Sequence, residues 1–483
     1  MELVALLGES EVDGASENPE VRGVANDSRR VSAGDVFVAM SGGKSDGNLH
    51  VAEAVSAGAV AVVSSLPRHA GIEVPWVRSP HPRRALGRIA ARLAGDPASR
   101  LVLAGVTGTN GKTTTSTLLS AILARRHGGA GLIGTVGHRT GSREIPARHT
   151  TPEAPELQAL LAEMVANGLS AAAMEVSSHA LELERVEGCR FDLAVFTNLT
   201  RDHLDFHGTF ERYYEAKKRL FALRKEGGPA VLNLADPWGD RLAREVGGPI
   251  VTYSASGAAD VEAAEVRCDL EGIAMRVVTP SPSFSLESPL IGRFNVENLL
   301  AATAGALALG ISPQEIASAV RSVHSVPGRM ERVEAGQPYT IVVDYAHTED
   351  ALRRLLLAVR DLTDRQVILV FGCGGDRDAG KRFPMGEVAG RLADIPIVTS
   401  DNPRSEDPEA IISQVEEGIV SSGATKYLKL ADRREAIRAA IELANPRTVV
   451  VIAGKGHETI QVIGGRELPF DDRAVAAGLA RSR

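Results

Sequence analysis

Residues 105–115 read GVTGTNGKTTT, and they say more about the fold than any other part of the chain. The apolar run LVLA comes directly before them, and a helical pattern, STLLSAIL, comes directly after them. A strand, a glycine-rich turn and a helix N-terminus in this order cradle an anion, because backbone N–H groups turn inward and the helix dipole favours negative charge. Lys112 can reach a terminal phosphate, and the Thr113 hydroxyl stands where it could ligate Mg²⁺. The stretch therefore predicts a phosphate site within an α/β fold.

The loop departs from the usual phosphate-loop spacing, which would place a first glycine where Val106 stands. A strand-to-helix turn that simply needs glycine is the alternative interpretation. Lysine and threonine directly after Gly111 favour phosphate binding instead. The residues expected to bind nucleotide phosphates are Gly108, Thr109, Asn110, Gly111, Lys112, Thr113 and Thr114.

The composition excludes several classes of protein. A chain of 483 residues has room for about three domains, and its formal charge of −7 gives no electrostatic reason to expect nucleic acid. Three cysteines are too few for a disulfide framework or a thiolate metal site. The first residues, MELV, carry no basic leader, and no run approaches the roughly 20 apolar residues that span a bilayer. We therefore expect a soluble, cytoplasmic, multidomain enzyme without a membrane span.

Strands and helices alternate along the chain in three α/β blocks. We predict domains at residues 1–98, 99–331 and 332–483, with mainly parallel sheets, because short apolar runs between helices are typical of strands covered on both faces. Strands are expected at residues 36–39, 59–63, 171–176, 193–198, 229–234, 250–253, 340–344, 367–371, 395–400 and 449–453. Helices are expected at residues 52–57, 83–94, 210–222 and 298–309, a linker at 95–97 and a meander of short strands at 260–291.

Polar side chains follow two of these strands directly. Residues 174–179, MEVSSH, place a carboxylate and an imidazole at a strand end, which suits Mg²⁺ and its water shell. Residues 201–207, RDHLDFH, hold two Asp, two His and one Arg after the next strand, and α/β sheets bind their ligands at such carboxyl ends. A solvated loop could carry the same charges. Helical periodicity alone makes the nearby Lys217 an ordinary exposed lysine.

The basic residues are unevenly divided, with nine lysines and forty-five arginines. Arginine would supply surface charge equally well, so each remaining lysine is a candidate for a specific role. Four of them fall inside motif-like segments: Lys112, Lys217, Lys381 and Lys455.

Taken together, seven motifs resemble the Mur ligases, which build the peptide stem of the bacterial cell-wall precursor. They are GTNGKTT at residues 108–114, EVSSH at 175–179, NLTRDHLDFHG at 198–208, YEAK at 214–217, GRFNVEN at 292–298, GRME at 328–331 and DYAH at 344–347. They span the chain in order, which chance will not produce. The resemblance implies a role in peptidoglycan synthesis, and so in cell shape and division.

The resemblance also implies three domains: one for a UDP-sugar substrate, a central phosphate-loop ATPase, and a C-terminal Rossmann-like domain that brings an amino acid. ATP is the implied co-substrate and Mg²⁺ the implied cofactor. The implied metal ligands are Thr113, Glu175, His203 and Lys217, the last as N6-carboxylysine, and the implied catalytic residues are Lys112, Lys217 and His203. Asn295 and Asn298 are expected near adenine, Arg329 near the phosphates, Asp344 near the ribose and His347 close to the nucleotide. Glu349 departs from the family, whose members usually have proline there.

Further segments indicate the substrates. Ser28, Thr150, Thr151, Ser177 and Arg185 match the family's site for UDP-N-acetylmuramoyl-dipeptide. Arg377, Asp401, Asn402, Pro403, Arg404, Gly454 and Glu458 match the site for meso-diaminopimelate in the ligases of the third step. Arg404 offers a bidentate fork for the second carboxylate of diaminopimelate, a group that lysine lacks. A surface turn is the alternative interpretation of the Asn-Pro pair. We expect a monomer that joins diaminopimelate to the D-glutamyl end of this dipeptide.

Two other functions remain open on the sequence alone. A ligase of the same family that adds lysine or another amino acid, or a folylpolyglutamate synthetase, would share the ATP site. Arg404 and the DSR segment at residues 27–29 argue against both. A regulatory nucleotide switch would leave the third block unexplained, and ATP turnover that depends strictly on two co-substrates would exclude it.

Overall fold

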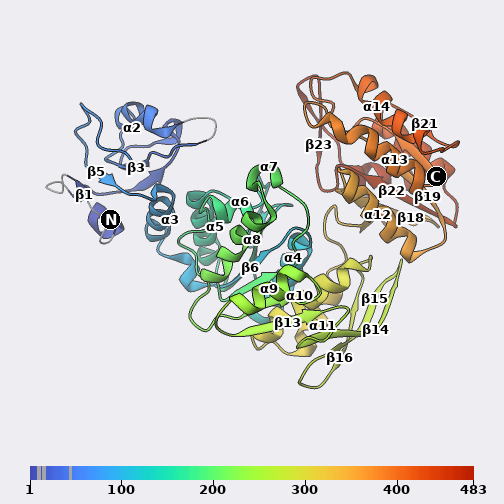
Figure 1. The fold of residues 1–483 in the computed structure, drawn as a ribbon, viewed down its shortest axis with the longest axis horizontal. Coiled ribbons are helices and arrows are strands. Elements are labelled where there is room, and N and C mark those ends of the chain that lie inside the picture. Colours follow the sequence, from blue (N-terminus) through green and yellow to red (C-terminus); the bar gives the residue numbers. More distant parts are fainter. Residues whose placement is uncertain (8–11, 14–17, 43–45, 483) are drawn as a thin grey trace. The chain divides into compact units, whose positions relative to one another are not determined.

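The computed structural model describes residues 1–7, 12–13, 18–42 and 46–482. The chain divides into two compact units (Figure 1). The first consists of Met1–Glu262, Val278–Pro282 and Asn298–Ala319, and the second of Ala263–Val277, Ser283–Glu297 and Val320–Arg483. Most strand pairs in the described residues are parallel. The predicted α/β class with mainly parallel sheets is confirmed.

The amino-terminal sheet has the strand order β1-β5-β4-β3-β2. Its strands are β1 (Val12–Asp13), β2 (Gly23–Ala25), β3 (Asp35–Val38), β4 (Ala61–Ser64) and β5 (Trp76–Arg78). Alternate residues face opposite sides, as the two-residue period of a strand requires. Val36 and Val38 pack in one cluster with α3 (Pro82–Leu93), and Phe37 packs in the other with α2 (Val51–Ser56).

The sheet that carries the phosphate loop has β6 (Val102–Thr107) between β10 (Ala171–Glu175) and β11 (Leu193–Phe196), all parallel. Parallel pairing brings the carboxyl ends of the three strands to one edge, where the loop, Glu175 and the segment after residue 196 all begin. The sheet continues through β12 (Ala230–Asn233) and β13 (Ile250–Ser254) on one side, and through β7 (Gly131–Ile133), β8 (His138–Arg139) and β9 (Glu144–Ile145) on the other.

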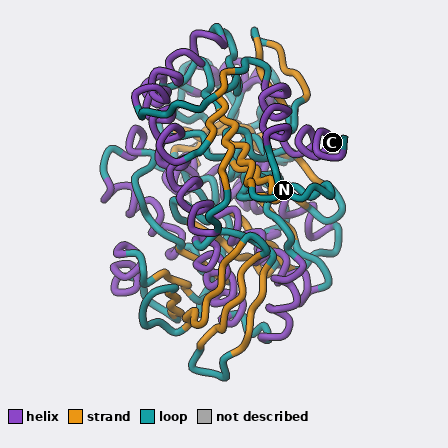
Figure 2. The backbone as a smooth tube through the Cα atoms, turned by 90° about the vertical axis from the view of Figure 1, so that its right-hand side faces the viewer, coloured by secondary structure: helices purple, strands orange, loops and turns teal. Residues whose placement is uncertain are grey.

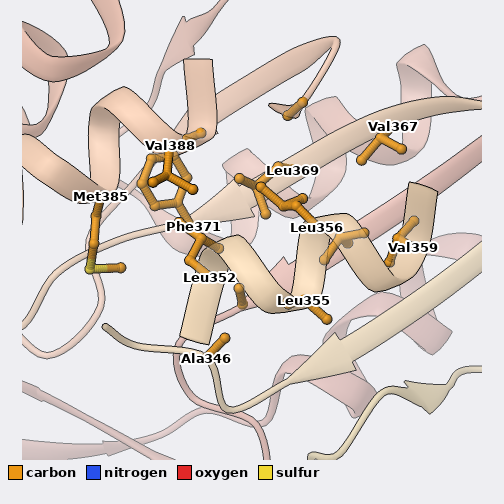
Figure 3. Packing of buried hydrophobic residues seen from close by; sticks show 14 of the residues in the cluster. Ala346, Leu352, Leu355, Leu356, Val359, Val367, Leu369, Phe371, Met385 and Val388 are labelled. Carbon is orange, nitrogen blue, oxygen red and sulfur yellow. The ribbon is translucent and has the colours of Figure 1, made fainter. Parts of the chain in front are cut away.

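The carboxyl-terminal sheet has the order β17-β18-β22-β19-β20-β21, with helices on both faces. Val367, Leu369 and Phe371 point to the side of α12 (Glu349–Leu362), α13 (Arg382–Leu392) and α14 (Pro408–Ser421), and Figure 3 shows them packed against α12 and α13. Ile368 and Val370 point to the side of α15 (Arg433–Leu443) and α16 (Asp472–Arg481). This alternation covers both faces of the sheet, as the apolar runs predict.

Figure 2 shows the helices, strands and loops along the backbone. The remaining strands are β14 (Val261–Asp269), β15 (Gly272–Val278), β16 (Phe284–Ser288), β17 (Glu331–Arg332), β18 (Thr340–Asp344), β19 (Gln366–Phe371), β20 (Ile395–Val398), β21 (Leu428–Lys429), β22 (Thr448–Ala453), β23 (Ile460–Ile463) and β24 (Arg466–Pro469). The remaining helices are α1 (Leu3–Leu7), α4 (Lys112–His127), α5 (Ala154–Ala166), α6 (Ser178–Glu182), α7 (Leu204–His207), α8 (Phe210–Ala222), α9 (Pro237–Glu245), α10 (Phe294–Ala308) and α11 (Pro313–Ser322), with 3-10 turns at Ser28–Arg30, Gly47–His50, Pro97–Arg100 and Ala379–Lys381.

The expected strands, helices and meander all occur, with ends displaced by up to a few residues. The main displacement is α10, which begins at Phe294 and not at residue 298, because Val296 continues the buried face of the helix. The antiparallel hairpins β8–β9 and β23–β24 were not predicted, since strands of two to four residues are too short to show a period. None of the helices in the described part of the chain is long and apolar enough to cross a bilayer.

Candidate active site

The phosphate loop joins β6 to α4 in the backbone conformation that its glycines allow. Gly108 has a φ of +150°, and a Cβ at this position would collide with Thr197 Oγ1. Gly111 has a φ of +84°, and a Cβ there would collide with Asn298 Oδ1. The loop is held from behind, where the Thr109 and Asn110 N–H groups donate to residue 198 at 2.8 and 2.9 Å. Its open side is therefore left to a ligand.

Lys112 lies across this loop. Its Nζ donates to the carbonyl oxygens of Gly108 and Thr109, both at 2.9 Å. Carbonyl oxygens are weak partners for an ammonium compared with a phosphate. Lys112 thus lies against the backbone of the loop that the sequence predicts to bind phosphate.

Exchanging Gly111 for alanine tests this geometry. Because the backbone at residue 111 is left-handed, a side chain there should lower the free energy of unfolding by about 1–2 kcal/mol. The new Cβ should also displace Asn298 and so reduce nucleotide affinity. Gly128 is the matched control, because its φ is +77° and nothing lies within 4 Å of its would-be Cβ. Denaturant unfolding and ADP titration should show a stability loss in both variants and an affinity loss only in Gly111→Ala. Wild-type affinity in that variant would contradict the assignment.

Thr113 and Glu175 meet at the edge of the sheet. The Thr113 hydroxyl donates to Glu175 Oε2 at 3.0 Å, and the other carboxylate oxygen accepts the Thr135 N–H at 2.7 Å. They meet because β10 pairs with β6 and puts Glu175 beside Val106. No three His, Cys, Asp or Glu side chains gather as a metal site in the described residues. A hydroxyl and a buried carboxylate fit Mg²⁺, a hard cation that keeps several waters and few protein ligands.

Lys217 is buried, so the expectation from helical periodicity was wrong. Its side chain is 1% exposed, its Nζ donates to the Gly108 carbonyl at 2.7 Å, and it lies 4.3 Å from the centre of the Tyr213 ring. Burial lowers the pKa of Lys217 well below its usual value, and the charge of Lys112 adds to the effect while Asp202 opposes it. The environment therefore favours a neutral amine, the form that reacts with CO₂.

Three histidines gather next to these lysines. The His179 ring lies 4.6 Å from His203 and 5.5 Å from His207, between ring centres. Burial lowers the pKa of His207 to about 4, and its Nε2 is 3.0 Å from the Ser178 hydroxyl. Burial also lowers the pKa of His203, with Asp202 opposing the effect and the charge of Lys112 adding to it. A neutral His203 suits the metal-ligand role that the sequence indicates.

Four of the five residues expected at the dipeptide substrate come together after β10. The Thr151 hydroxyl donates to the Glu175 carbonyl at 2.9 Å and accepts the Ser177 N–H at 3.1 Å. Arg185 donates to the Thr151 carbonyl at 3.2 Å, and the Thr150 hydroxyl is 3.0 Å from that of Thr135. Ser28 is not bonded to them; it begins the 3-10 turn Ser28–Arg30, where its hydroxyl donates to Glu53 at 3.3 Å.

The other residues expected at the nucleotide lie in different places. Asn298 belongs to the first unit, against Gly111. Arg329, Asp344 and His347 belong to the second unit and surround Tyr345. The Asp344 carboxylate accepts the N–H groups of residues 330 and 346, both at 2.8 Å, and burial raises its pKa while Arg329 opposes that rise. Asn295, also in the second unit, donates to the residue 291 carbonyl at 2.7 Å. Their roles towards a nucleotide stay predictions.

Glu349, the departure from the family pattern, begins α12 directly after its N-cap, Thr348. That first position suits proline, and it also suits an acidic side chain because of the helix dipole. Glu349 in addition pairs with Arg353 at 2.6 Å. The substitution therefore leaves the helix start intact.

The residues expected at the amino acid form a second cluster, between the loops after β20 and β22. Asn402 Nδ2 donates to Glu458 Oε2 at 3.0 Å, and the would-be Cβ of Gly454 lies 3.3 Å from an Asp401 oxygen. Pro403 precedes Arg404, whose φ is +55° and whose Nη1 donates to the Gly375 carbonyl at 2.7 Å.

Arg377 lies on the glycine-rich loop after β19. Its Nη1 donates to the carbonyl of its neighbour Asp376 at 3.0 Å. The Asp376 carboxylate accepts the Ser405 hydroxyl at 2.7 Å, and this bond connects the two loops.

Three charged residues that support this cluster were not predicted as site residues. Arg433 and Asp472 form a completely buried ion pair at 2.7 Å, and Lys455 is buried beside Asp401. Of these three residues, only Lys455 was marked as a candidate by the sequence, because the chain contains few lysines. The Arg433–Asp472 pair joins residues 39 positions apart and has no local pattern.

The geometry is that of a phosphate-loop protein, with the loop at the carboxyl edge of a parallel sheet and a cluster of charged side chains in the second unit. Family models match three stretches: "Mur ligase family, catalytic domain" at residues 20–93, "Mur ligase middle domain" at 106–306 and "Mur ligase, glutamate ligase domain" at 328–456. The chain belongs to the Mur ligase family. Members of that family are ATP-dependent ligases, and the chain is an enzyme of this class.

Several relatives carry one and the same name, UDP-N-acetylmuramoyl-L-alanyl-D-glutamate–2,6-diaminopimelate ligase. The relative from Geobacillus kaustophilus is 48% identical, over 96% of each chain. The relative from Geobacter metallireducens is 44% identical, over 99% of this chain and 98% of its own. A solved structure of that name is 36% identical, covers 100% of this chain and 99% of its own, and has a TM-score of 0.74.

Proposed function

We propose that this chain is the ligase that joins meso-2,6-diaminopimelate to UDP-N-acetylmuramoyl-L-alanyl-D-glutamate at the expense of ATP, in the synthesis of the peptidoglycan precursor. The whole-length similarity to relatives of that name supports it. The observation that carries it is the amino-acid cluster, where Arg404 and Glu458 offer one cation and one carboxylate to a ligand that has both charges.

The reaction has two steps. The D-glutamyl γ-carboxylate attacks the γ-phosphorus of ATP, and ADP leaves as an acyl phosphate forms. The amine of diaminopimelate then attacks the acyl carbon, inorganic phosphate leaves, and the amine loses a proton. Lys112 neutralises phosphate charge in the first step, so positioning and electrostatics account for the catalysis, and no protein nucleophile is needed.

Mg²⁺ is part of the proposal. Thr113, Glu175, His203 and the carbamate of Lys217 would hold it, and it would neutralise the charge of the phosphate oxygens. CO₂ would convert the neutral Lys217 amine into a carbamate with release of one proton, so a buried amine would become an anionic ligand. The burial of Lys217 next to Lys112 supports this change, because it disfavours the ammonium.

The remaining parts of the proposal concern organisation. We assign residues 1–98 to the UDP-sugar, 99–331 to ATP and 332–483 to the amino acid. Ser28, Thr150, Thr151, Ser177 and Arg185 would bind the UDP-N-acetylmuramoyl-dipeptide. Asn295, Asn298, Arg329, Asp344 and His347 would bind the nucleotide. A monomer in the cytoplasm, where ATP and UDP-sugars are available, is the form we expect.

Arg404 is expected to select diaminopimelate over lysine. Loss of a charged hydrogen bond of this kind costs about 1.5–3 kcal/mol, so Arg404→Ala should use diaminopimelate roughly ten- to a hundredfold less efficiently. Lysine has no second carboxylate and should be affected far less. ADP release is assayed to obtain kcat/KM for each of the two amino acids, and the measurement is the ratio of these two values.

The exposed Arg466 on β24 provides the control, and Arg466→Ala should keep the wild-type ratio. The KM for ATP should stay constant in both variants. An unchanged ratio in Arg404→Ala would remove Arg404 from the selectivity argument and reopen the choice of amino acid.

A further inference from the structure

Lys455 is a buried lysine that the proposed reaction does not use. It lies two residues after the end of β22, and its side chain is 0% exposed. Its Nζ lies 3.2 Å from Asn402 Oδ1, 3.3 Å from Glu458 Oε2 and 3.8 Å from Asp401 Oδ1. A buried charge of this kind is stabilised only when it is paired and hydrogen-bonded, and Lys455 has both. One ammonium thus contacts three residues of the amino-acid cluster.

These contacts fix the orientation of the Asn402 amide. Its Oδ1 accepts hydrogen bonds from Lys455 Nζ and from the Val462 N–H at 3.0 Å, and its Nδ2 donates to Glu458 at 3.0 Å. An amide with two donors at its oxygen and a carboxylate at its nitrogen cannot flip without losing all three bonds. Lys455 therefore locks the loop after β20 to the loop after β22.

The other buried cation nearby is already engaged. Arg433 donates to both oxygens of Asp472, at 2.8 and 2.7 Å, and to the Ala453 carbonyl at 3.0 Å. It holds the end of β22 from the opposite side. Glu458 has Lys455 as its ion-pair partner at 3.3 Å, while about a third of the Glu458 side chain remains exposed. The exposed part of that carboxylate can face a ligand.

The residue type fits this position. The chain uses arginine five times as often as lysine, yet here it has lysine. An ammonium is a compact point charge whose three N–H groups can reach three separate acceptors, whereas a guanidinium is a planar fork that needs more space. At this enclosed site the Lys455 ammonium has acceptors on three residues, Asn402, Glu458 and Asp401.

We propose that Lys455 is a positioning residue for the incoming amino acid. Its ammonium holds Glu458 and Asn402 in the orientation in which Glu458 receives the charged amine of that substrate. This inference rests on the proposed function of the cluster as the amino-acid site. Lys455 itself does not touch the substrate; it acts through Asn402 and Glu458.

The test is Lys455→Met, which keeps the length and removes the charge. The KM for diaminopimelate should rise roughly tenfold or more, because Glu458 loses its partner and turns to solvent. The KM values for ATP and for the UDP-dipeptide should stay at the wild-type level, whereas a general loss of structure would move all three. Lys429→Met is the matched control, since Lys429 pairs with Glu416 at 2.9 Å on the surface of the same unit. An unchanged KM for the amino acid in a folded Lys455→Met enzyme would overturn the inference.

A measurement on the wild-type enzyme covers the case in which the variant does not fold. With nine lysines in the chain, ¹⁵N-labelled side-chain ammonium groups can be followed by NMR, and a buried, hydrogen-bonded group exchanges slowly. Adding the amino acid should shift the Lys455 resonance, and adding ADP alone should not. A resonance that is indifferent to the amino acid would contradict the positioning role.

The two proposals fail in different ways. Both experiments use whichever amino acid the wild-type enzyme consumes. If that is not diaminopimelate, the proposed function is wrong in its substrate, and the Lys455 test proceeds with the acid that is consumed. If diaminopimelate is consumed and Lys455→Met binds it normally, the inference about Lys455 alone is wrong.

Discussion

Lys112→Ala should abolish ADP release while the protein stays folded. Lys112 is the cation directly at the phosphate loop, held 2.9 Å from two loop carbonyls. Loss of a preorganised electrostatic stabiliser costs on the order of 3 kcal/mol or more in the barrier, which is at least about a hundredfold in rate. The assay is steady-state ADP release with all three substrates present.

Thermal unfolding supplies the control for Lys112→Ala. The Lys112 ammonium bonds two carbonyl oxygens of its own loop, and we expect only a small change in the unfolding temperature when it is removed. Lys112→Met, which keeps the aliphatic stem, should be equally inactive. Near-normal ADP release by either folded variant would show that this loop is not the catalytic phosphate site.

Lys217→Ala should be nearly inactive as well, for a different reason. If the carbamate of Lys217 holds Mg²⁺, alanine removes a metal ligand, and short carboxylic acids in the buffer should restore part of the activity by occupying the vacated space. If Lys217 acts as an unmodified ammonium, added carboxylic acids should not restore the activity of Lys217→Ala, because a carboxylic acid does not replace a cation. The measurement is ADP release with and without added acetate or formate.

Lys218 is the matched control for Lys217, since it is the next residue on α8 but lies at the surface, paired with Glu245 at 2.7 Å. Lys218→Ala should keep its activity and show no response to added acids. Well-resolved density for an unmodified Lys217 in CO₂-equilibrated enzyme, with the metal site filled, would count against the carbamate.

Much of the fold was predictable because its signals are local. The phosphate loop follows from glycine, lysine and threonine at adjacent positions, and Gly108 and Gly111 do have the backbone angles that only glycine adopts easily. The buried strands follow from apolar runs, and β18 has the same bounds as predicted. The short hairpins β8–β9 and β23–β24 were missed, since two to four residues carry no usable period.

The candidate site was predictable to a lesser degree. The motifs located the phosphate loop and the DNPR segment at residues 401–404, and the structure brings Asn402 to Glu458, 56 positions away. Arg377 was expected at the same ligand, and its guanidinium bonds the carbonyl of its own neighbour, so its role towards the amino acid stays a prediction. Arg433 and Asp472 were not expected, because neither stands in a recognisable pattern.

The sequence by itself determined the family, the alternation of strands and helices, and the glycine-rich loop between a strand and a helix at residues 105–115. All of these depend on neighbouring residues or on a period along one strand or helix. Only the tertiary structure decided which charges are buried. Lys217 looks exposed on its own helix and is buried because it meets Gly108, 109 positions away. Lys455 likewise meets Asn402 across 53 positions. Burial is set by the elements that pack against a side chain, and these can be distant in the sequence. The burial that changes the pKa of Lys217 and the role of Lys455 is therefore not visible in the residues next to them.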